Sequence, residues 1–315
     1  MHRRNFGAAL AAALALAAAG ASAQSTRVDV AISGSTAFAP FTLAKAAGIF
    51  DRHHLDVSLR KVTESYRGLA LASGGVQCAA ARADNWIVWS AAGLAATQIF
   101  EIARSGGEDV LVARPGIAKV ADLKGRAVAA GARGTSSYFL LAWFLAHNGA
   151  SIRDVRVVGV APQSAAAAFA TGSGDIDAAL TSEPYAGMLR DRSNALATSA
   201  DASAVLDTFG CTNRFLAGGG GVARAIADSY FEALELIKRE PQKSYAIMAA
   251  DVKQSVDQFE ASQKGVRWQD RAANRRSFAR DHAATAREAA DLLVDIGVIP
   301  QAPDIARLAD ARYIP

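Results

Sequence analysis

The sequence predicts an α/β protein of two similar lobes, each a mostly parallel β-sheet flanked by helices. From Arg27 to Leu180, short apolar runs alternate with longer helical patterns, and this order implies right-handed crossovers between parallel strands. The segments SGGVQCAA (73–80) and SGDIDAA (173–179) both lead from a glycine turn into a small-residue strand, which indicates two lobes rather than one long sheet. After Gly221 the pattern is almost wholly helical.

Residues 1–23 have the features of a secretory signal peptide. A basic start with Arg3 and Arg4 precedes an uncharged Ala/Leu run and a small-residue Ala-Ser-Ala site, with cleavage expected before Gln24. The two arginines also fit a twin-arginine motif, so both export routes stay open. No Cys follows the cleavage site, and the longest other apolar run, 138–146, is too short to span a bilayer. We therefore expect a soluble periplasmic protein without a lipid anchor.

The predicted elements follow from apolar periodicity and from glycine punctuation. The first round has strands at 28–32, 55–61 and 76–81 and helices at 41–50 and 66–72. The second round has strands at 110–113, 127–130, 155–160 and 176–180, a short helix at 120–125, and helices at 136–148 and 163–170. A further helix is predicted at 222–239.

Composition and charge argue against nucleic acid as a partner. The chain is 51% hydrophobic and 20% charged, which is ordinary for a soluble protein, and loss of Arg3 and Arg4 lowers its formal charge from +4 to +2. The densest basic cluster, 267–280, has the acidic neighbours Asp270 and Asp281. We interpret it as a solvated helix face rather than a nucleic-acid groove.

The loops at the carboxyl ends of the strands are the expected ligand site, because ligands of open α/β sheets bind there. These loops are 33–38, 82–86, 131–137, 162–164 and 181–185, and two facing lobes would place them on opposite walls of a cleft. The candidate binding residues, most of them in these loops, are Ser35, Thr36, Phe38, Asp84, Asn85, Trp86, Gly134, Thr135, Ser136, Ser137, Gln163, Glu183 and Asn213.

The segment from Gly134 to Ser137 lies just where a helix begins, and it has two interpretations. Ser and Thr hydroxyls cap a first helical turn. Alternatively, the free N–H groups and hydroxyls hold an anion, which a helix N-terminus favours. Its place after the predicted strand 127–130 favours the anion, and little competing acid is expected nearby.

The other candidates also have structural alternatives. Asp84 and Asn85 contact the solute or form a turn. Glu183 meets a ligand ammonium or forms a structural salt bridge, and Trp86 is interpreted as an apolar cleft wall. Trp143 is expected in a core.

Three further patterns carry little functional signal. His53 and His54 are adjacent and lack supporting ligands, so no metal site is expected. The glycines 218–221 lack a following Lys-Ser/Thr and are predicted to form a hinge or turn. The segment 134–138 falls one Gly short of a hydrolase elbow, and His147 lies on the same helix, too far away to act as its base. We therefore predict no catalytic residues and no cofactor.

Four stretches resemble the periplasmic substrate-binding proteins of ABC importers, in the group that binds nitrate, taurine and aliphatic sulfonates. They are AAGIFDRHHLDVSL (46–59), GIAKVADLKGRAVAAGARGTSSYFLL (116–141), AAFATGSGDIDAALTSEPY (167–185) and GVRWQDRAANRRSF (265–278). Related members bind thiamine-precursor pyrimidines. The resemblance covers nearly all of the mature chain.

The resemblance implies a type II periplasmic-binding-protein fold with two hinge crossings and no chemistry performed. Lobe 1 would comprise 24–111 and 206–315, and lobe 2 would comprise 112–205. A monomer would capture a small organic anion or zwitterion and deliver it to an inner-membrane ABC permease. The alternatives left open are a pyrimidine binder, a periplasmic enzyme on this fold, and a sensor that presents ligand to a receptor kinase.

The chain departs from the family pattern at three places. Ser182 stands where a Trp is common before Glu-Pro, so an aromatic wall is lost, and Trp86 or Trp89 is a candidate replacement. The loop 82–86 is more polar and aromatic than in the group. His54 stands where a Gly usually precedes Leu-Asp-Val, at a helix end that favours a left-handed residue.

Cys78 and Cys211 are the only cysteines of an exported chain, which favours pairing. The family architecture implies that the segment returning from lobe 2 enters the lobe-1 sheet beside its third strand, where Cys78 lies. The alternative is two buried thiols that serve as small hydrophobes.

Overall fold

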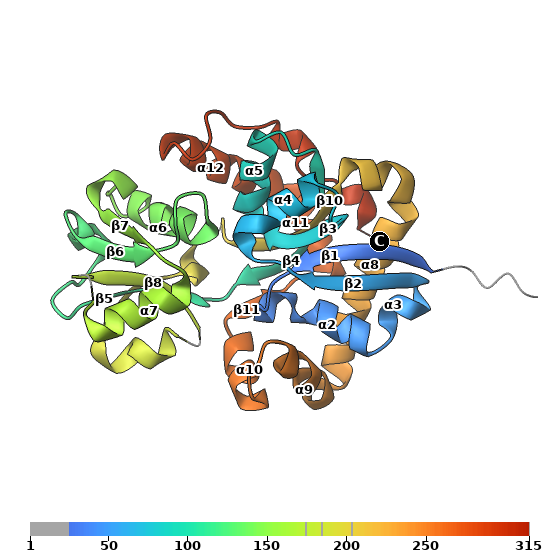
Figure 1. Ribbon diagram of the computed structural model, residues 1–315, viewed down its shortest axis with the longest axis horizontal. Helices are drawn as coiled ribbons and strands as arrows, with labels where there is room; N and C mark the ends of the chain where they lie inside the picture. Colours follow the sequence, from blue (N-terminus) through green and yellow to red (C-terminus); the bar gives the residue numbers. More distant parts are fainter. Residues whose placement is uncertain (1–24, 174, 184, 203, 315) are drawn as a thin grey trace, which may run out of the picture.

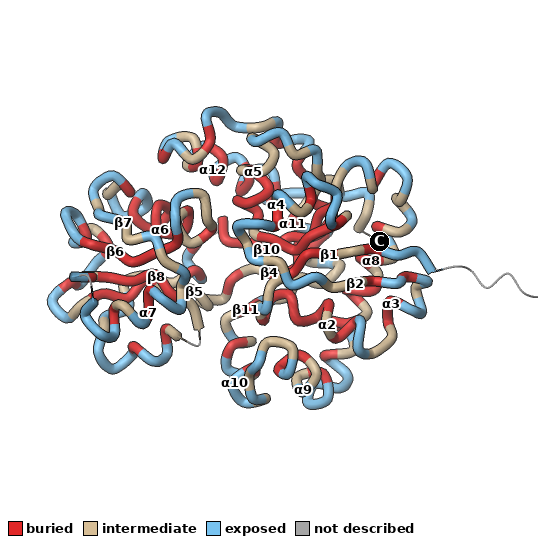
Figure 2. The backbone as a smooth tube through the Cα atoms, in the orientation of Figure 1, coloured by how far each residue is buried: buried red, intermediate tan, exposed pale blue. Residues whose placement is uncertain are grey.

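Two β-sheets with helices on their faces lie side by side along the long axis of the molecule (Figure 1). The computed structural model describes residues 25–173, 175–183, 185–202 and 204–314. The expected signal peptide lies outside the described residues. Buried backbone runs through the centre of both sheets, and the exposed backbone lies mainly in the surrounding helices and loops (Figure 2).

The first sheet has the strand order β11-β4-β10-β3-β1-β2. Its strands are β1 (Thr26–Ile32), β2 (Leu55–Lys61), β3 (Cys78–Arg82), β4 (Ala96–Ser105), β10 (Leu206–Thr212) and β11 (Val266–Trp268). Strand β1 is parallel to β2 and β3, whereas β10 is antiparallel to both β3 and β4, and β11 is antiparallel to β4.

The second sheet repeats this arrangement with the order β7-β6-β8-β5-β9. Its strands are β5 (Asp109–Ala113), β6 (Ala127–Ala130), β7 (Arg156–Gly159), β8 (Ala178–Ser182) and β9 (Asn194–Thr198). The three parallel strands lie in the order β2-β1-β3 in the first sheet and β7-β6-β8 in the second. In each sheet the next strand, β10 or β5, is antiparallel to β3 or β8. Both sheets are therefore mixed rather than mostly parallel, because the strands next to the crossings run against their neighbours.

The helices differ in number between the two sheets. Around the first sheet lie α2 (Ala39–Ala46), α3 (Ile49–Arg52), α4 (Glu64–Ala72), α5 (Ala83–Ala91), α8 (Asn213–Arg239), α9 (Pro241–Asp251), α10 (Val256–Gln263), α11 (Arg271–Arg280) and α12 (His282–Asp295). The second sheet carries α6 (Ser136–Ala146) and α7 (Pro162–Thr171). Short 3-10 turns are η1 (Thr36–Phe38), η2 (Val120–Leu123), η3 (Ile152–Asp154), η4 (Gly187–Arg192), η5 (Ser199–Asp201), η6 (Ile305–Arg307) and η7 (Ala311–Tyr313). Among the described residues, no helix has the length and apolar character needed to cross a membrane.

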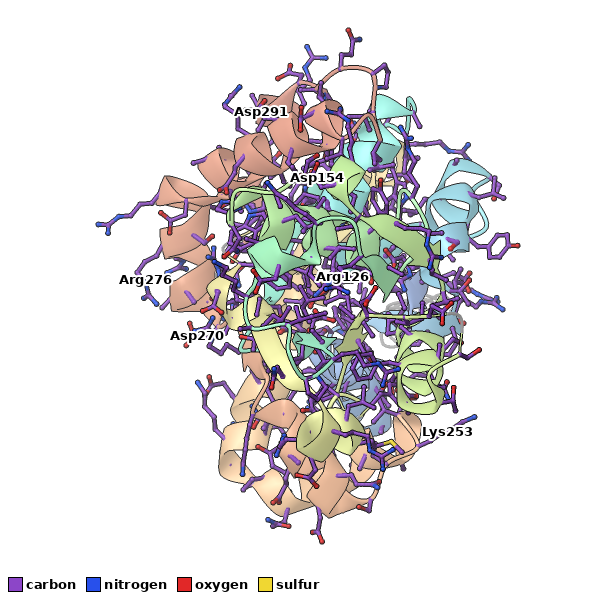
Figure 3. All side chains as sticks on the ribbon, turned by 90° about the vertical axis from the view of Figure 1, so that its left-hand side faces the viewer. Arg126, Asp154, Lys253, Asp270, Arg276 and Asp291 are labelled. Carbon is purple, nitrogen blue, oxygen red and sulfur yellow. A yellow bond between two sulfur atoms is a disulfide. The ribbon has the colours of Figure 1, made fainter. Side chains whose placement is uncertain are left out.

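Several predicted elements differ from the structure for local reasons. The expected helix at 41–50 is divided into α2 and α3, because Gly48 adopts a left-handed conformation with φ 64°. The glycines at 218–221, predicted to form a hinge or turn, lie within α8, where Gly219 interrupts the helical dihedral angles. His54 has φ 56° after α3, as its position before β2 suggested. On α11, Arg276 is exposed and Asp270 is partly so, which agrees with a solvated helix face (Figure 3).

The core of the first sheet is a cluster of stacked aromatic rings. Phe41 of α2 lies 5.1 Å from Phe209 of β10, and Phe100 of β4 lies 5.1 Å from both Phe209 and Tyr230, measured between ring centroids. Tyr230 of α8 is fully buried and donates its hydroxyl to the Ile102 carbonyl at 2.5 Å. This hydrogen bond satisfies the buried phenol and fixes α8 on the sheet.

A second apolar cluster joins helices from both parts of the molecule. Trp143 and the neighbouring apolar residues of α6 pack on the second sheet, as expected for a core helix. The same cluster extends to Ile87 of α5 and to Ala289 and Leu293 of α12. Glu288 of α12 also accepts a hydrogen bond from the Trp143 indole at 3.3 Å. The C-terminal helix therefore contacts α6 as well as its own sheet.

Two chain crossings, 105–108 and 199–205, connect the sheets and lie side by side. The hydroxyls of Ser105 and Ser199 are 2.5 Å apart, and Ser199 Oγ accepts the Asp109 N–H at 3.0 Å. A Cβ on Gly106 would lie 3.1 Å from the Gly265 backbone, so a larger residue at this crossing would push the two backbones apart by a few tenths of an ångström. The two sheets are therefore joined by two adjacent crossings that hydrogen-bond to each other.

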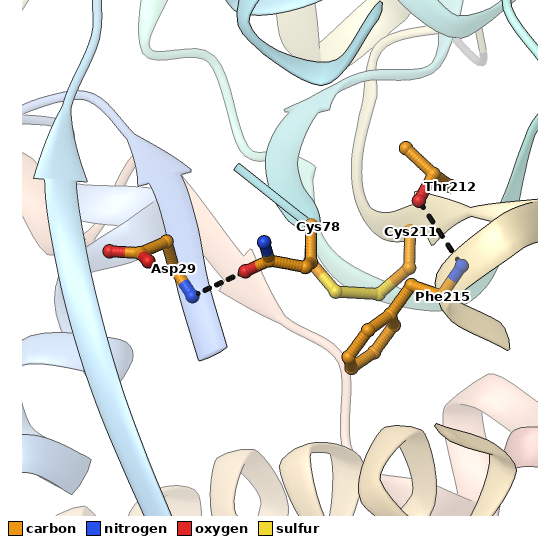
Figure 4. The surroundings of a disulfide bond; sticks show 6 residues. Asp29, Cys78, Cys211, Thr212 and Phe215 are labelled. Atoms are coloured by element: carbon orange, nitrogen blue, oxygen red, sulfur yellow. Dashed lines mark hydrogen bonds between the residues drawn. A yellow bond between two sulfur atoms is a disulfide. The ribbon is translucent and has the colours of Figure 1, made fainter. Parts of the chain in front are cut away.

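A disulfide joins Cys78 of β3 to Cys211 of β10 (Figure 4). The two residues are register partners in the antiparallel pair, with Cα atoms 4.0 Å apart. Immediately after Cys211, Thr212 caps α8 by accepting the Phe215 N–H. The bond encloses a separation of 133 residues that includes the whole second sheet.

We predict that reduction of the disulfide lowers the free energy of unfolding by up to about 4–5 kcal/mol, because the bond closes a long loop in the unfolded chain. Urea unfolding of the wild type with and without reductant measures this difference, and the Cys78→Ala/Cys211→Ala double variant should match the reduced protein. Equal midpoints for oxidised and reduced protein, with thiols verified by alkylation, would contradict the prediction.

Candidate functional site

A cavity of about 490 Å³ lies where the two sheets meet. The first sheet and its helices supply Ser33, Gly34, Ser35, Thr36, Phe38, Glu64, Arg67, Arg82, Asn85 and Asp207. The second sheet supplies Ser136, Ser137, Pro162, Ser182, Glu183 and Tyr185, and the first crossing and β5 supply Glu108 and Asp109. Val252, Lys253 and Gln254, from the end of α9 and the loop after it, complete the lining. Both walls of the cavity therefore carry polar side chains.

The structure brings seven of the predicted residues to this cavity. They are Ser35, Thr36, Phe38, Asn85, Ser136, Ser137 and Glu183. Ser35 caps η1 by accepting the Ala37 N–H at 3.2 Å, which turns the chain after β1 along the cavity wall. Asn85 lies in the first turn of α5, which begins directly after β3 rather than after a loop.

Six predicted residues do not line the cavity. They are Asp84, Trp86, Gly134, Thr135, Gln163 and Asn213. Asn213 lies at the opposite end of β10 from Asp207, where it accepts a hydrogen bond from Thr97. The ring of Trp86 packs at the place where Gly210 lacks a Cβ, and its side chain is buried in the core. Gln163 is exposed beyond Pro162.

Glu183 has local partners as well as a place on the cavity wall. Its Oε2 accepts the Gly187 N–H at 3.0 Å, and its Oε1 lies 3.5 Å from an Arg190 guanidinium nitrogen. The carboxylate thus already takes part in the turn that leads into η4.

The start of α6 is a capped helix terminus at which two N–H groups of the first turn, those of Ser136 and Tyr138, are engaged by side chains. Thr135 Oγ1 accepts the Tyr138 N–H at 3.3 Å, and Ser137 Oγ accepts the Gly131 N–H at 3.0 Å. The Ser136 N–H donates to Glu64 Oε1 at 2.7 Å. The Ser136 N–H, which the sequence analysis assigned to a ligand anion, is therefore already bound by the Glu64 carboxylate.

Two carboxylates meet at Ser136, contrary to the expectation of little acid nearby. Glu64 comes from α4, where its Oε1 also accepts the Asn85 amide at 3.0 Å. Asp84 comes from α5 and accepts the Ser136 hydroxyl at 2.8 Å. That part of the sequence-based argument was wrong, because both acids reach α6 from helices far away in the chain.

Two of the three basic side chains that line the cavity have partners within the protein. Arg67 donates to the carbonyl oxygens of Ala80 at 2.6 Å and Val62 at 3.3 Å. Arg82 forms an ion pair with Asp109 that links β3 to β5. Burial opposes the charge of Arg82, but Asp109 and the other carboxylates around it raise its pKa above the usual range.

Three acids in or beside the cavity have raised pKa values, and two of them, Asp207 and Glu108, have no hydrogen-bond or ion-pair partner among the described residues. Asp207 is only 6% exposed and stands opposite Arg82 in the β3–β10 register. Burial raises its pKa to about 6, although the Arg82 charge opposes the rise. Burial and the charges of Asp109 and Asp207 raise the pKa of Glu108 well above its usual range. Burial and the Glu64 charge raise the pKa of Asp84 to about 7. Perturbed groups of this kind mark functional sites.

Sequence reasoning missed most of these charged residues. Asp207 lies near the start of β10 and Arg82 at the end of β3, and both strands are otherwise largely apolar. A charged residue at the end of an apolar strand is a sequence signal for a site at that end of the sheet. Glu64 follows the predicted strand 55–61, but this segment was not among the expected ligand loops, and Glu108 gave no comparable signal because β4, which precedes it, was not predicted.

The profile of the family described as NMT1/THI5 like matches residues 35–250. Comparison with curated protein sequences gives no match.

Solved structures share the fold at low sequence identity. The periplasmic aliphatic sulphonate-binding protein SsuA from Escherichia coli is 20% identical, with a TM-score of 0.75 over 89% of this chain and 91% of that chain. The alkanesulfonate-binding protein SsuA from Xanthomonas axonopodis pv. citri, bound to MOPS, is 19% identical, with a TM-score of 0.74 over 91% of this chain and 99% of that chain. The periplasmic nitrate-binding protein NrtA from Synechocystis PCC 6803 is 13% identical, with a TM-score of 0.72 over 91% of this chain and 87% of that chain.

The raised carboxyl pKa values predict that the protein loses stability as pH rises. Asp84 and Asp207 keep a proton in the folded state above pH 3.8, their ordinary pKa, up to about 7 and about 6 respectively. Because the folded state binds more protons in this window, the free energy of unfolding should fall by up to about 1.4 kcal/mol per pH unit for each group.

Urea unfolding at several pH values between 4 and 8 measures this slope. Asp84→Asn, whose amide oxygen can still accept from Ser136, should flatten the slope between pH 6 and 7. The exposed Asp191→Asn variant is the matched control and should keep the wild-type slope. An unchanged slope in Asp84→Asn would contradict the assignment.

Proposed function

Because the chain belongs to the NMT1/THI5-like family and shares its fold with periplasmic sulfonate- and nitrate-binding proteins, we propose that it is the solute-binding component of an ABC importer. It captures a small zwitterion between its two lobes and delivers it to an inner-membrane permease. In this proposal the mature protein is a periplasmic monomer that performs no chemistry.

The observation that carries the proposal is the position of the cavity. Its walls come from both sheets, and Glu108 and Asp109 of the lining belong to the crossing and to the strand that follows it. A change in the angle between the sheets would open or close this cavity, and a ligand that contacts both walls would favour the closed form. The crossings support lobes close to the expected 24–111 with 206–315 and 112–205.

Charge supports a zwitterion over a simple anion. Five carboxylates line the cavity against three basic side chains, two of which are engaged by Asp109 and by backbone carbonyls. A ligand with only negative charge would meet net repulsion, whereas a ligand with an ammonium group would meet unpaired acids.

A thiamine-precursor pyrimidine is the second candidate ligand. The exocyclic amine of an aminopyrimidine is a hydrogen-bond donor, and the carboxylates of the cavity are acceptors for such a donor.

We expect zwitterions or aminopyrimidines to raise the melting temperature in a thermal-shift panel, because a ligand at 100 times its Kd stabilises by about 2.7 kcal/mol. The hits should reduce the radius of gyration in solution scattering, as the lobes close. A panel in which only neutral sugars or metal ions stabilise the protein would contradict the proposal. Turnover of a hit by the purified protein would instead favour an enzyme.

A further inference from the structure

Asp207 is a buried acid that faces the cavity without a partner. Its side chain is only 6% exposed and lines the cavity. Within the described part of the chain, no group donates a hydrogen bond to its carboxylate or forms an ion pair with it. The cation opposite it in the strand register, Arg82, is already paired with Asp109. A desolvated carboxylate of this kind is stabilised when a cation or a donor meets it.

Glu108 extends the same acidic surface from the first crossing. The Glu108 backbone is held there, because its carbonyl accepts the Glu183 N–H at 2.8 Å. It also packs closely on Gly265, where an added Cβ would lie 3.1 Å from the Glu108 Cα. Its carboxylate also accepts no hydrogen bond from the described residues. Asp207 and Glu108 line the same cavity, and the charges of Asp109 and Asp207 both add to the rise of the Glu108 pKa that burial causes.

The opposite wall cannot hold a ligand anion in the expected place. Glu64 already accepts the Ser136 N–H, and Asp84 already accepts the Ser136 hydroxyl. An additional anion at Ser136 would meet both acids, so the N–H and hydroxyl of Ser136 are closed to it.

The third basic residue of the lining is Lys253. It follows α9, has φ 59° and is exposed at the edge of the molecule (Figure 3). No acidic side chain of the described residues lies within ion-pair distance of its ammonium. It is therefore the basic group of the lining that remains available to an anionic ligand end.

We propose that Asp207 and Glu108 form a cation seat that binds the ammonium group of the ligand, while the anionic end of the ligand faces Lys253. This inference rests on the proposed function and specifies the substrate class: a compact solute with a cationic nitrogen at its inner end. The orientation is the reverse of the one implied by the family resemblance, in which the helix terminus holds the anion.

Backbone amide NMR of the full mature protein tests the seat with three probes of matched shape. The probes are ethylammonium, ethanesulfonate and taurine, titrated at ionic strength matched with KCl. Ethylammonium and taurine should shift the amide resonances of Asp207 and Glu108, and ethanesulfonate should leave the resonances of Ser136 and Ser137 unchanged.

Asp207→Asn should weaken ethylammonium binding about tenfold or more, because it removes one charged partner without removing a protein hydrogen bond. Its melting temperature should equal or exceed that of the wild type, which shows that the variant folds. Glu235→Gln, which removes a carboxylate on α8 outside the cavity lining, is the matched control and should leave the affinity unchanged.

A second variant tests whether Glu64 excludes anions. Glu64→Ala should let ethanesulfonate shift the amides of Ser136 and Ser137, whereas Glu64→Gln, which keeps the acceptor oxygen, should do so much less. The cation seat is overturned if ethylammonium does not shift the Asp207 amide resonance. It is also overturned if ethanesulfonate shifts the Ser136 amide resonance in the wild-type protein. Binding of a ligand without a cationic nitrogen also overturns it, yet leaves the solute-binding function intact.

Discussion

The antiparallel pairing of β10 with β3 is the constraint on which the rest of the structure depends. Strand β10 brings the chain back from the second sheet, and its register places Cys211 opposite Cys78 and Asp207 opposite Arg82. One end of this pair carries the disulfide, and the other end reaches the cavity. Because a slip of one residue would turn every side chain to the opposite face, the disulfide and the cavity charges require the same register.

The charges at the junction of the sheets explain why the cavity is acidic. Arg82 and Asp109 neutralise one another across the junction, and Arg67 is held by backbone carbonyls. Asp207 and Glu108 form no direct ion pair among the described residues, although the Arg82 charge acts on both, and their desolvation is a cost that a folded protein tolerates mainly at functional sites. The same junction contains both crossings, so in the proposed function a ligand bound there would act where the two sheets are joined.

The sequence predicted most of the fold, because glycine turns and apolar periodicity mark the strands at 55–61 and 127–130 and the helices around them. It missed β4, whose apolar pattern is interrupted by Gln98 and by Glu101, a buried acid that pairs with His282. Four of the five expected loops contribute predicted residues to the cavity, but the segment 82–86 is mostly the start of α5, and the contacts within these segments were not predicted. Glu64 meets Ser136 across 72 residues of sequence, and no local pattern encodes such a contact.

The central claim is that the cleft holds a small solute with a cationic nitrogen. Its most direct test is mass spectrometry of the small molecules released from protein purified natively from the periplasm, without refolding. The account predicts a stoichiometric compound that contains a basic amine or an amino-substituted ring. A stoichiometric sulfonate, nitrate or carboxylate without any basic nitrogen would contradict it.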